Sequence, residues 1–95
     1  MYVRISRAKC EPTRTAEVKA VIDHLKERVD EAPGVQHWIS LLTADGELVV
    51  ASFFLDEQAL QNTADINEKR WADAADLLQG PPHVTQGKVL AFVST

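Results

Sequence analysis

Residues 35–55 read Val35-Gln-His-Trp-Ile-Ser-Leu-Leu-Thr43, Ala44-Asp45-Gly46-Glu47 and Leu48-Val-Val-Ala-Ser-Phe-Phe-Leu55. Asp-Gly between two apolar runs predicts a β-hairpin, because both residues tolerate the positive φ of a tight two-residue turn. A strand with one solvated face should alternate apolar and polar residues, and neither of these strands does so. We therefore expect both faces of the sheet to be covered, one by helices and the other by a second copy of the chain.

The predicted turn also sets the register of the hairpin. With Asp45-Gly46 at the tip, three pairs lie opposite one another: Leu42 with Val49, Trp38 with Phe53, and His37 with Phe54. One face would then hold Trp38, Leu42, Val49, Ala51, Phe53 and Leu55. The other face would hold His37, Ile39, Leu41, Val50 and Phe54. A bulge anywhere in the hairpin would exchange the faces of one strand.

The segment before the hairpin predicts a strand and then a helix. Residues 1–9 alternate in the manner of a strand. Thr13 or Thr15 is a suitable cap for the helix that follows, and Ala32-Pro33-Gly34 ends it. Five apolar residues lie at helical spacing on one face of this helix: Val18, Val21, Ile22, Leu25 and Val29.

The segment after the hairpin predicts a second helical region and a last strand. Asp56 is a good N-cap for helix that reaches about Gln79, with a break between residues 63 and 66 where helix propensity is poor. Its apolar stripe consists of Leu60, Ala64, Trp71, Ala75 and Leu78. Residues 83–86 and 88–94 form the last strand, with a kink at Gly87.

The predicted order is β-α-β-β-α-β, which favours a ferredoxin-like α+β fold. Right-handed crossovers place both helices on one face of a four-stranded antiparallel sheet. With 95 residues the chain forms one domain, residues 1–95. A domain of this size buries a limited share of its surface, so dimerisation through the open sheet face would stabilise it.

Composition narrows the classes of partner. The net charge of −4 argues against nucleic acid, which usually needs a basic face. No apolar run is long enough to span a bilayer, and Met1-Tyr2-Val3-Arg4-Ile5 lacks the apolar core of a signal peptide. Cys10 is the only cysteine, which excludes an intrachain disulfide and makes a reducing cytoplasm the simplest location.

Two segments resemble the antibiotic-biosynthesis-monooxygenase-like family: Ala32-Pro33-Gly34-Val35 before the hairpin and Val49-Val-Ala-Ser-Phe-Phe-Leu-Asp-Glu-Gln-Ala-Leu60 after it. The resemblance implies a dimeric α+β barrel, in which two sheets pack face to face. Members of the family include cofactor-independent oxygenases of aromatic polyketides, haem-degrading enzymes and small-molecule isomerases, and many members have no known activity.

The chain departs from the family pattern at several positions. Phe54 stands where the family often has Trp, and Thr63 where it often has His. Haem-degrading members have an Asn on the first strand and a His some ten residues after the helix Trp; here Pro81 lies ten residues beyond Trp71, which argues against haem degradation. The quinone-forming branch holds its substrate with Asn and Trp one helical turn apart, and Asn67 and Trp71 have that spacing.

Asn67 and Trp71 are the candidate catalytic pair. If the helix is continuous, Asn67 lies within the apolar stripe, where a buried amide without a partner costs roughly 1–3 kcal/mol. Its amide must therefore meet backbone, water or a ligand, and the plainer alternative is a local cap at a helix break. Trp71 could stack on a flat substrate or simply anchor the core. Trp38 has the same ambiguity and could equally face the partner chain.

Four further residues are candidates for substrate binding: Asn62, His37, Phe54 and His83. His37 could act as a general base beside a cavity, although a lone His on an apolar strand is usually a hydrogen-bonded core residue. His83 follows Pro81-Pro82, as an ordinary loop residue would. The three histidines lie on three elements without metal-ligand spacing, so the sequence assigns no metal and no other cofactor.

Three functions remain open at the level of sequence. The first is a cofactor-independent monooxygenase of a small aromatic or apolar molecule, in which a base or amide stabilises a carbanion or enolate that reacts with dioxygen. The second is a non-catalytic ligand-binding dimer with the same pocket. The third is a structural dimer whose pocket is filled by its own side chains. A cavity of a few hundred Å³ would separate the first two from the third.

Overall fold

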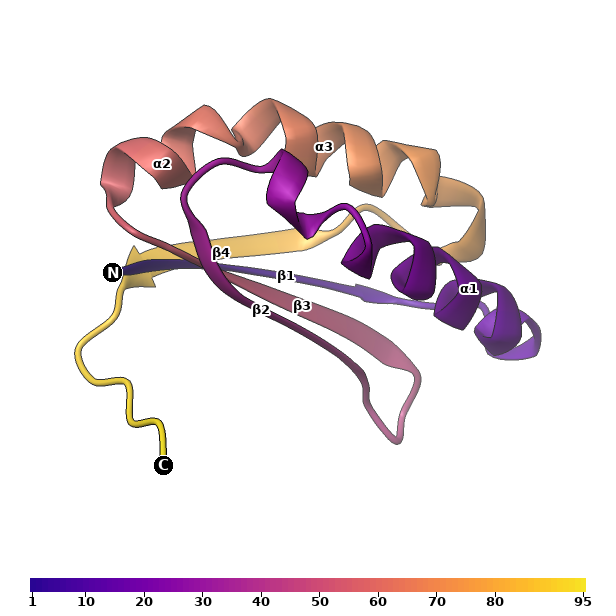
Figure 1. Ribbon diagram of the computed structural model, residues 1–95. Coiled ribbons are helices and arrows are strands. Elements are labelled where there is room, and N and C mark those ends of the chain that lie inside the picture. Colours follow the sequence, from indigo (N-terminus) through magenta and orange to yellow (C-terminus); the bar gives the residue numbers. More distant parts are fainter.

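A four-stranded antiparallel sheet carries all of the helices on one of its faces in the computed structural model, which describes residues 1–95 (Figure 1). The strands are β1 (Tyr2–Lys9), β2 (Val35–Leu42), β3 (Glu47–Phe54) and β4 (His83–Lys88). Their order across the sheet is β2-β3-β1-β4. This arrangement confirms the predicted ferredoxin-like α+β fold.

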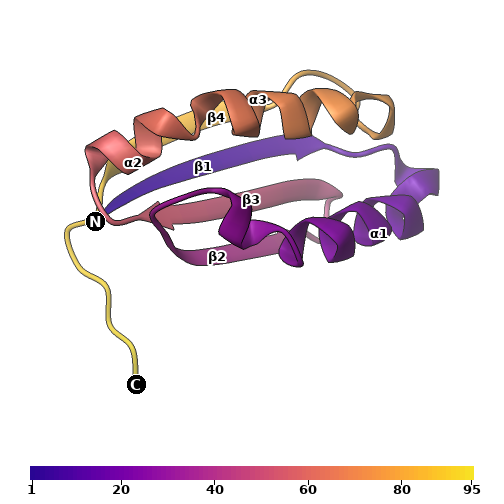
Figure 2. The same cartoon turned by 45° about the horizontal axis from the view of Figure 1, so that its top comes forward.

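The helices lie over different halves of the sheet. They are α1 (Thr15–Lys26), α2 (Glu57–Asn62) and α3 (Ala64–Asp73), with short 3-10 turns at Pro12–Arg14, Val29–Glu31 and Ala75–Leu77. In Figure 2, α2 and α3 run above β1 and β4, whereas α1 lies toward β2 and β3. None of the helices has the length and apolar character that a bilayer crossing needs.

The caps of the helices agree only in part with the predictions. Asp56 caps α2 as predicted, because its Oδ1 accepts a hydrogen bond of 2.8 Å from the Ala59 N–H. The prediction for α1 is wrong: its N-cap is Arg14, without a capping side chain, since Thr13 lies inside a 3-10 turn and Thr15 is already helical. The helical region breaks at Thr63, within the predicted window.

The predicted hairpin register is wrong by one residue. Leu42 pairs with Leu48 and Trp38 with Ser52. Relative to β2, each side chain of β3 therefore lies on the other face of the sheet from the one predicted. The reason is the turn: Thr43 and Glu47 close a three-residue loop, in which the Glu47 carbonyl accepts a bond of 2.8 Å from the Thr43 N–H. Gly46 takes φ +85° at the end of that loop, as in a hairpin with a glycine bulge.

The corrected register gives the two faces of the sheet different characters, because residues paired across antiparallel strands point to the same side. The face toward the helices holds Trp38, Leu48, Val50, Ser52 and Phe54, together with Arg4, Ser6 and Ala8 of β1. The open face is more uniformly apolar. Its apolar members are Val3, Ile5, Ile39, Leu41, Val49, Ala51 and Phe53.

The last strand is shorter than predicted. β4 ends at Lys88, whereas the sequence pattern extends it to residue 94 with a kink at Gly87. The Val89 N–H still bonds to the Met1 carbonyl at 2.9 Å, and the chain then leaves the sheet. The tail turns under the open face, where the Phe92 ring stacks on His37 with centroids 4.5 Å apart. Leu90 and Val93 of this tail are 94% and 83% exposed.

Candidate functional site

Two adjoining spaces lie between the helices and the sheet. A small cavity of about 60 Å³ lies over the sheet beneath α1 and α3, which is room for about two water molecules. An open groove of about 690 Å³ runs beside it, between α3 and β4. The groove has the size of a small-molecule site, whereas the cavity alone does not. The residues that line both spaces are Arg4, Asn67 and Trp71.

Asn67 and Trp71 lie one turn apart on α3, at the boundary between the cavity and the groove. Trp71 is 8% exposed and also packs in the main core cluster, with Leu48 and Leu77 among its members. Asn67 is half-buried, and its amide makes no hydrogen bond to the protein. Trp71 therefore serves as a core anchor and as a wall of the site, while the Asn67 amide is free for water or a ligand.

The hydrogen bonds at the break between α2 and α3 do not involve the Asn67 side chain. The Thr63 hydroxyl donates a hydrogen bond of 2.9 Å to the Leu60 carbonyl at the end of α2. The Asn67 N–H bonds to the Thr63 carbonyl at 3.0 Å through its backbone alone. The geometry thus gives no support to a capping role for the Asn67 side chain.

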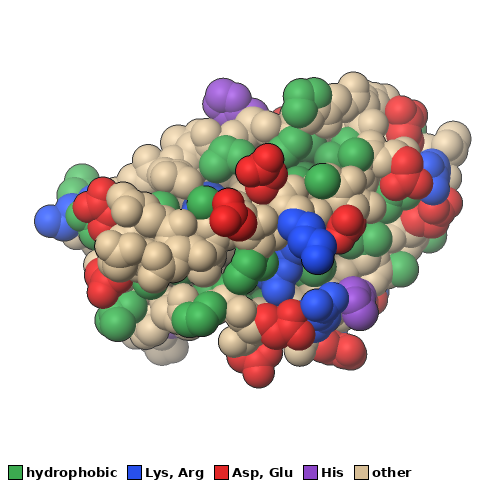
Figure 3. Space-filling model, turned by 90° about the horizontal axis from the view of Figure 1, so that it is seen from above, with side chains coloured by type: hydrophobic (Ala, Val, Ile, Leu, Met, Phe, Trp, Pro, Cys, Tyr) green, Lys and Arg blue, Asp and Glu red, His purple; other side chains and the backbone are tan.

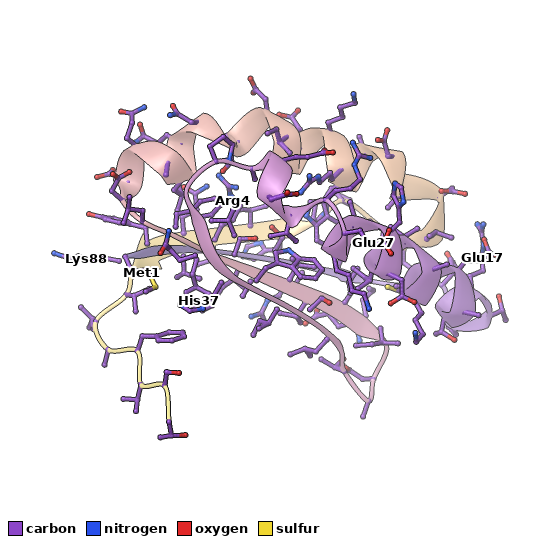
Figure 4. The ribbon with its side chains drawn as sticks, in the orientation of Figure 1. Met1, Arg4, Glu17, Glu27, His37 and Lys88 are labelled. Carbon is purple, nitrogen blue, oxygen red and sulfur yellow. The ribbon has the colours of Figure 1, made fainter.

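Arg4 lines both spaces and is the candidate site residue that the sequence analysis did not identify. It is 4% exposed, and its guanidinium lies above the sheet, beneath the helices (Figure 4). Nη1 donates to Thr63 Oγ1 at 3.0 Å and Nη2 to the Leu60 carbonyl at 2.6 Å. The guanidinium carbon lies 5.2 Å from the centre of the Phe54 ring, a cation–π distance. Burial lowers the pKa of this guanidinium below its usual value.

Among the predicted substrate-binding residues, only Phe54 lines the cavity. Phe54 is 1% exposed and supports Arg4 from below. His37 lies on the opposite side of the sheet, against Phe92 (Figure 4). His83, paired with Arg7, also belongs to the open face. Asn62 is exposed on α2, where it accepts a bond of 2.8 Å from Gln58. The structure therefore does not bring His37, His83 and Asn62 to the site.

The lining of the small cavity contains two cations and no carboxylate. The cations are Arg4 and Arg70, whereas the polar lining is otherwise limited to Ser52, Thr63 and Asn67. Arg70 is partly satisfied already, because it donates to the Arg28 carbonyl at 3.0 Å and lies 3.8 Å from Glu31. The groove adds one carboxylate, the exposed Glu68. On the outer surface of the helices, by contrast, acidic and basic side chains are intermixed (Figure 3).

The remaining reactive side chains lie apart from the site. Cys10 is buried in the core cluster, and burial raises the pKa of its thiol, as expected of an unreactive cysteine. His24 lies on α1, His37 on β2 and His83 on β4. No group of three or more His, Cys, Asp or Glu side chains converges in the chain.

This arrangement can hold a small flat molecule and polarise it. Trp71 offers an apolar ring, the Asn67 amide offers a donor and an acceptor, and the buried Arg4 offers positive charge. The lining contains no histidine, and its one carboxylate lies at the solvent side of the groove. Any proton abstraction at this site would depend on Glu68, on water or on the acidity of the ligand itself.

Comparison with known proteins places the fold. No family model matches the chain, and no curated protein matches it. Among solved structures, a protein of unknown function from Nitrosomonas europaea, NE2512, is 22% identical, with 99% of this chain and 93% of that chain covered and a TM-score of 0.84. A proposed antibiotic biosynthesis monooxygenase from the same organism is 21% identical, over 96% of this chain and 100% of that one, with a TM-score of 0.80.

A third neighbour has a ligand in its structure. It is a monooxygenase from the gene ActVA-Orf6 of Streptomyces coelicolor in complex with nanaomycin D. It is 18% identical, over 99% of this chain and 91% of that one, with a TM-score of 0.75. The fold of this chain is thus that of the antibiotic-biosynthesis-monooxygenase-like structures, in agreement with the resemblance inferred from sequence.

Proposed function

We propose that the chain binds a small aromatic or apolar molecule in the groove between α3 and β4, and that its activity is cofactor-independent oxygenation of that molecule. The observation that carries the proposal is the position of Asn67 and Trp71, which share the boundary of the cavity and the groove. A ring lying against Trp71 would bring its oxygen substituents within reach of the Asn67 amide. Neighbours of the same fold include monooxygenases, one of them with a small-molecule ligand.

The proposed chemistry uses the substrate as its own reductant. An enolate or phenolate, stabilised by hydrogen bonds from the protein, transfers electrons to dioxygen and forms a carbon–peroxide bond. The same carbon then loses its proton as the O–O bond breaks, which leaves one oxygen atom on the product as a carbonyl and releases the other as water. Preorganised donors stabilise such charge best where water is excluded. Arg4 and Asn67 are the donors that face the site.

A non-catalytic ligand-binding function is the second candidate, and one observation favours it. The lining offers no base except Glu68, which is exposed. A site without a positioned base can bind a molecule without converting it. Oxygen uptake in the presence of a bound phenol or anthrone separates the two candidates: consumption supports the oxygenase, and binding without consumption supports the binder.

We also propose that the working form is a homodimer through the open face of the sheet. Ile39, Leu41 and Phe92 on this side are 53%, 46% and 45% exposed, and apolar side chains gathered on one surface favour association. Only 14 of the 95 residues are buried, so one chain leaves much of its apolar content uncovered. A second copy would cover the same face by symmetry.

Binding to the proposed site is tested with phenols and anthrones by calorimetry and by NMR of the Trp71 indole N–H. We expect Asn67→Ala and Trp71→Phe to weaken binding about tenfold, the effect of losing one good contact of ~1.4 kcal/mol. Asn62→Ala is the matched control, because this amide lies in the same helical layer but outside the lining. Equal effects of Asn62→Ala and Asn67→Ala would contradict the proposed site.

A further inference from the structure

The charge of the site differs in sign from the charge of the protein. The chain carries a net −4, yet the small cavity is lined by Arg4 and Arg70 and by no carboxylate. The four other arginines each lie within 4 Å of a carboxylate: Arg7, Arg14, Arg28 and Arg70. Arg4 alone keeps a buried, uncompensated positive charge.

The hydrogen bonds of Arg4 compensate that charge only in part. Its two acceptors, Thr63 Oγ1 and the Leu60 carbonyl, are neutral groups. The Leu60 carbonyl lies near the C-terminal end of α2, where the helix dipole favours a cation, but α2 has only six residues. A buried guanidinium is expensive unless it is paired, and it offers more N–H groups than these two bonds use. A partner of opposite charge is therefore missing from the chain itself.

The same cation borders the place where we propose that a ligand lies. Arg4 lines both the small cavity and the groove, next to Asn67 and Trp71. Phe54 supports the guanidinium from one side at 5.2 Å, and Thr63 and Leu60 hold two of its donors. The guanidinium is thus held in one orientation by protein contacts, so that its remaining donors meet a ligand without further ordering.

Resting on the function proposed above, we propose that the ligand is an organic anion: a small aromatic or apolar molecule that carries a carboxylate, or an acidic phenol or enol already ionised in water. Its charged oxygen pairs with Arg4 while its ring lies against Trp71. An acidic phenol or enol that arrives ionised needs no positioned base, which agrees with the lining of the site. A carboxylate supplies only the charge that pairs with Arg4. In either case the negative charge of the ligand offsets the cost of burying Arg4.

Matched pairs of ligands test the charge preference on the unaltered protein. Small aromatic acids of one to three rings, such as 2-naphthoate, are compared with their primary amides, which have nearly the same shape and no charge. Calorimetry gives the affinities, and NMR shifts of Asn67 and the Trp71 indole locate the binding. We expect the acids to bind at least tenfold more tightly than the amides, with shifts at both residues.

Variants then assign the preference to Arg4. Arg4→Gln should reduce the difference between acid and amide to less than twofold, and Arg4→Lys should keep part of it. Lys69→Gln is the matched control: it removes one positive charge from the exposed face of α3, outside the lining, and should leave the preference intact. A preference that Lys69→Gln removes as readily as Arg4→Gln would overturn the assignment, since it would reflect net charge alone.

The outcomes separate this inference from the proposed function. Amides that bind as tightly as the acids, with shifts at Trp71, would overturn the anion preference and leave the ligand site standing. Acids that shift only residues of other surfaces would also overturn it. If no member of the panel, charged or neutral, shifts Asn67 or Trp71, the proposed ligand site itself fails.

Discussion

Thr63 and Asn67 lie four residues apart, and only the side chain of Thr63 makes hydrogen bonds within the protein. Thr63 is 2% exposed, and its hydroxyl both accepts from Arg4 and donates to the Leu60 carbonyl. Thr63→Val should cost about 1–3 kcal/mol, because Arg4 then loses an acceptor in a buried setting. Urea unfolding measures the loss. Thr13→Val, at an exposed position of the 3-10 turn before α1, is the control and should change stability by less than about 0.5 kcal/mol.

Asn67→Ala should leave stability nearly unchanged, within about 0.5 kcal/mol, because the amide makes no hydrogen bond to the protein and borders an open groove. A capping amide would instead cost about 0.5–2 kcal/mol. Thermal unfolding of this variant therefore checks the site without knowledge of the ligand. A loss as large as that of Thr63→Val would show that Asn67 has a structural role.

At the level of single elements, the hairpin turn contains a carboxylate, Asp45, that is hydrogen-bonded to two neighbouring side chains. The Asp45 carboxyl accepts from the Thr43 hydroxyl and from Lys9 Nζ, which lies 2.9 Å from Oδ2. These contacts, the Thr43 hydroxyl first, lower the pKa of Asp45 to about 2. The hairpin tip thereby ties β1 to the turn between β2 and β3.

The pH dependence follows from the sign of that shift. A carboxyl with a lower pKa in the folded chain stabilises the fold above its ordinary pKa near 4, and this contribution is lost as pH falls from about 4 to 2. An NMR titration of Asp45 should have its midpoint near 2, and Lys9→Met should raise it. In Asp45→Asn, stability should fall less steeply between pH 4 and 2 than in the unaltered chain; parallel curves would contradict the assignment.

The two glycines with positive φ each come just before a strand, Gly34 before β2 and Gly46 before β3, and they differ in how closely other atoms approach them. Gly34 and Gly46 both take φ +85°, a conformation that costs other residues about 1–2 kcal/mol. A Cβ at Gly46 would meet nothing within 4 Å, whereas at Gly34 it would lie 2.5 Å from the Cβ of Ala59. Gly34→Ala should therefore destabilise the chain clearly more than Gly46→Ala, as measured by chemical denaturation. Similar losses would mean that α2 moves away from the Gly34 turn at little cost.

At the scale of the whole molecule, the open sheet face is the surface expected to associate. Sedimentation at micromolar concentration should give a dimer, with an interface above roughly 1,000 Å². Ile39→Lys should shift the chain toward monomer while circular dichroism still shows its helices, because Ile39 is on the open face and 53% exposed. Ala20→Lys, on the exposed side of α1, is the control and should remain dimeric. A stable monomer of the unaltered chain would refute the dimer.

The order of the elements and most of their first residues could be predicted from the sequence, whereas α1 ends at Lys26 and β4 at Lys88, both earlier than predicted. The signals used for this prediction are local: apolar periodicity, Asp56 as a cap, and glycine or proline at the ends of elements. Each depends on neighbours within a few residues and can therefore be recognised in a single sequence. The pairing of Asn67 with Trp71 on one helix belongs to the same category, because one turn of α3 sets it.

Which side chains those elements direct toward one another depends on contacts between distant parts of the chain. Whether Gly46 ends a two- or a three-residue loop is a small difference in local energy, yet it reverses the faces of β3 relative to β2. His37 was thereby separated from the site, and Phe54 was placed beneath it. Arg4 stood in an ordinary alternating strand, and its burial depends on α2 and α3, more than fifty residues away in the chain. Contacts over such separations are set by packing across the whole sheet, which no local pattern encodes.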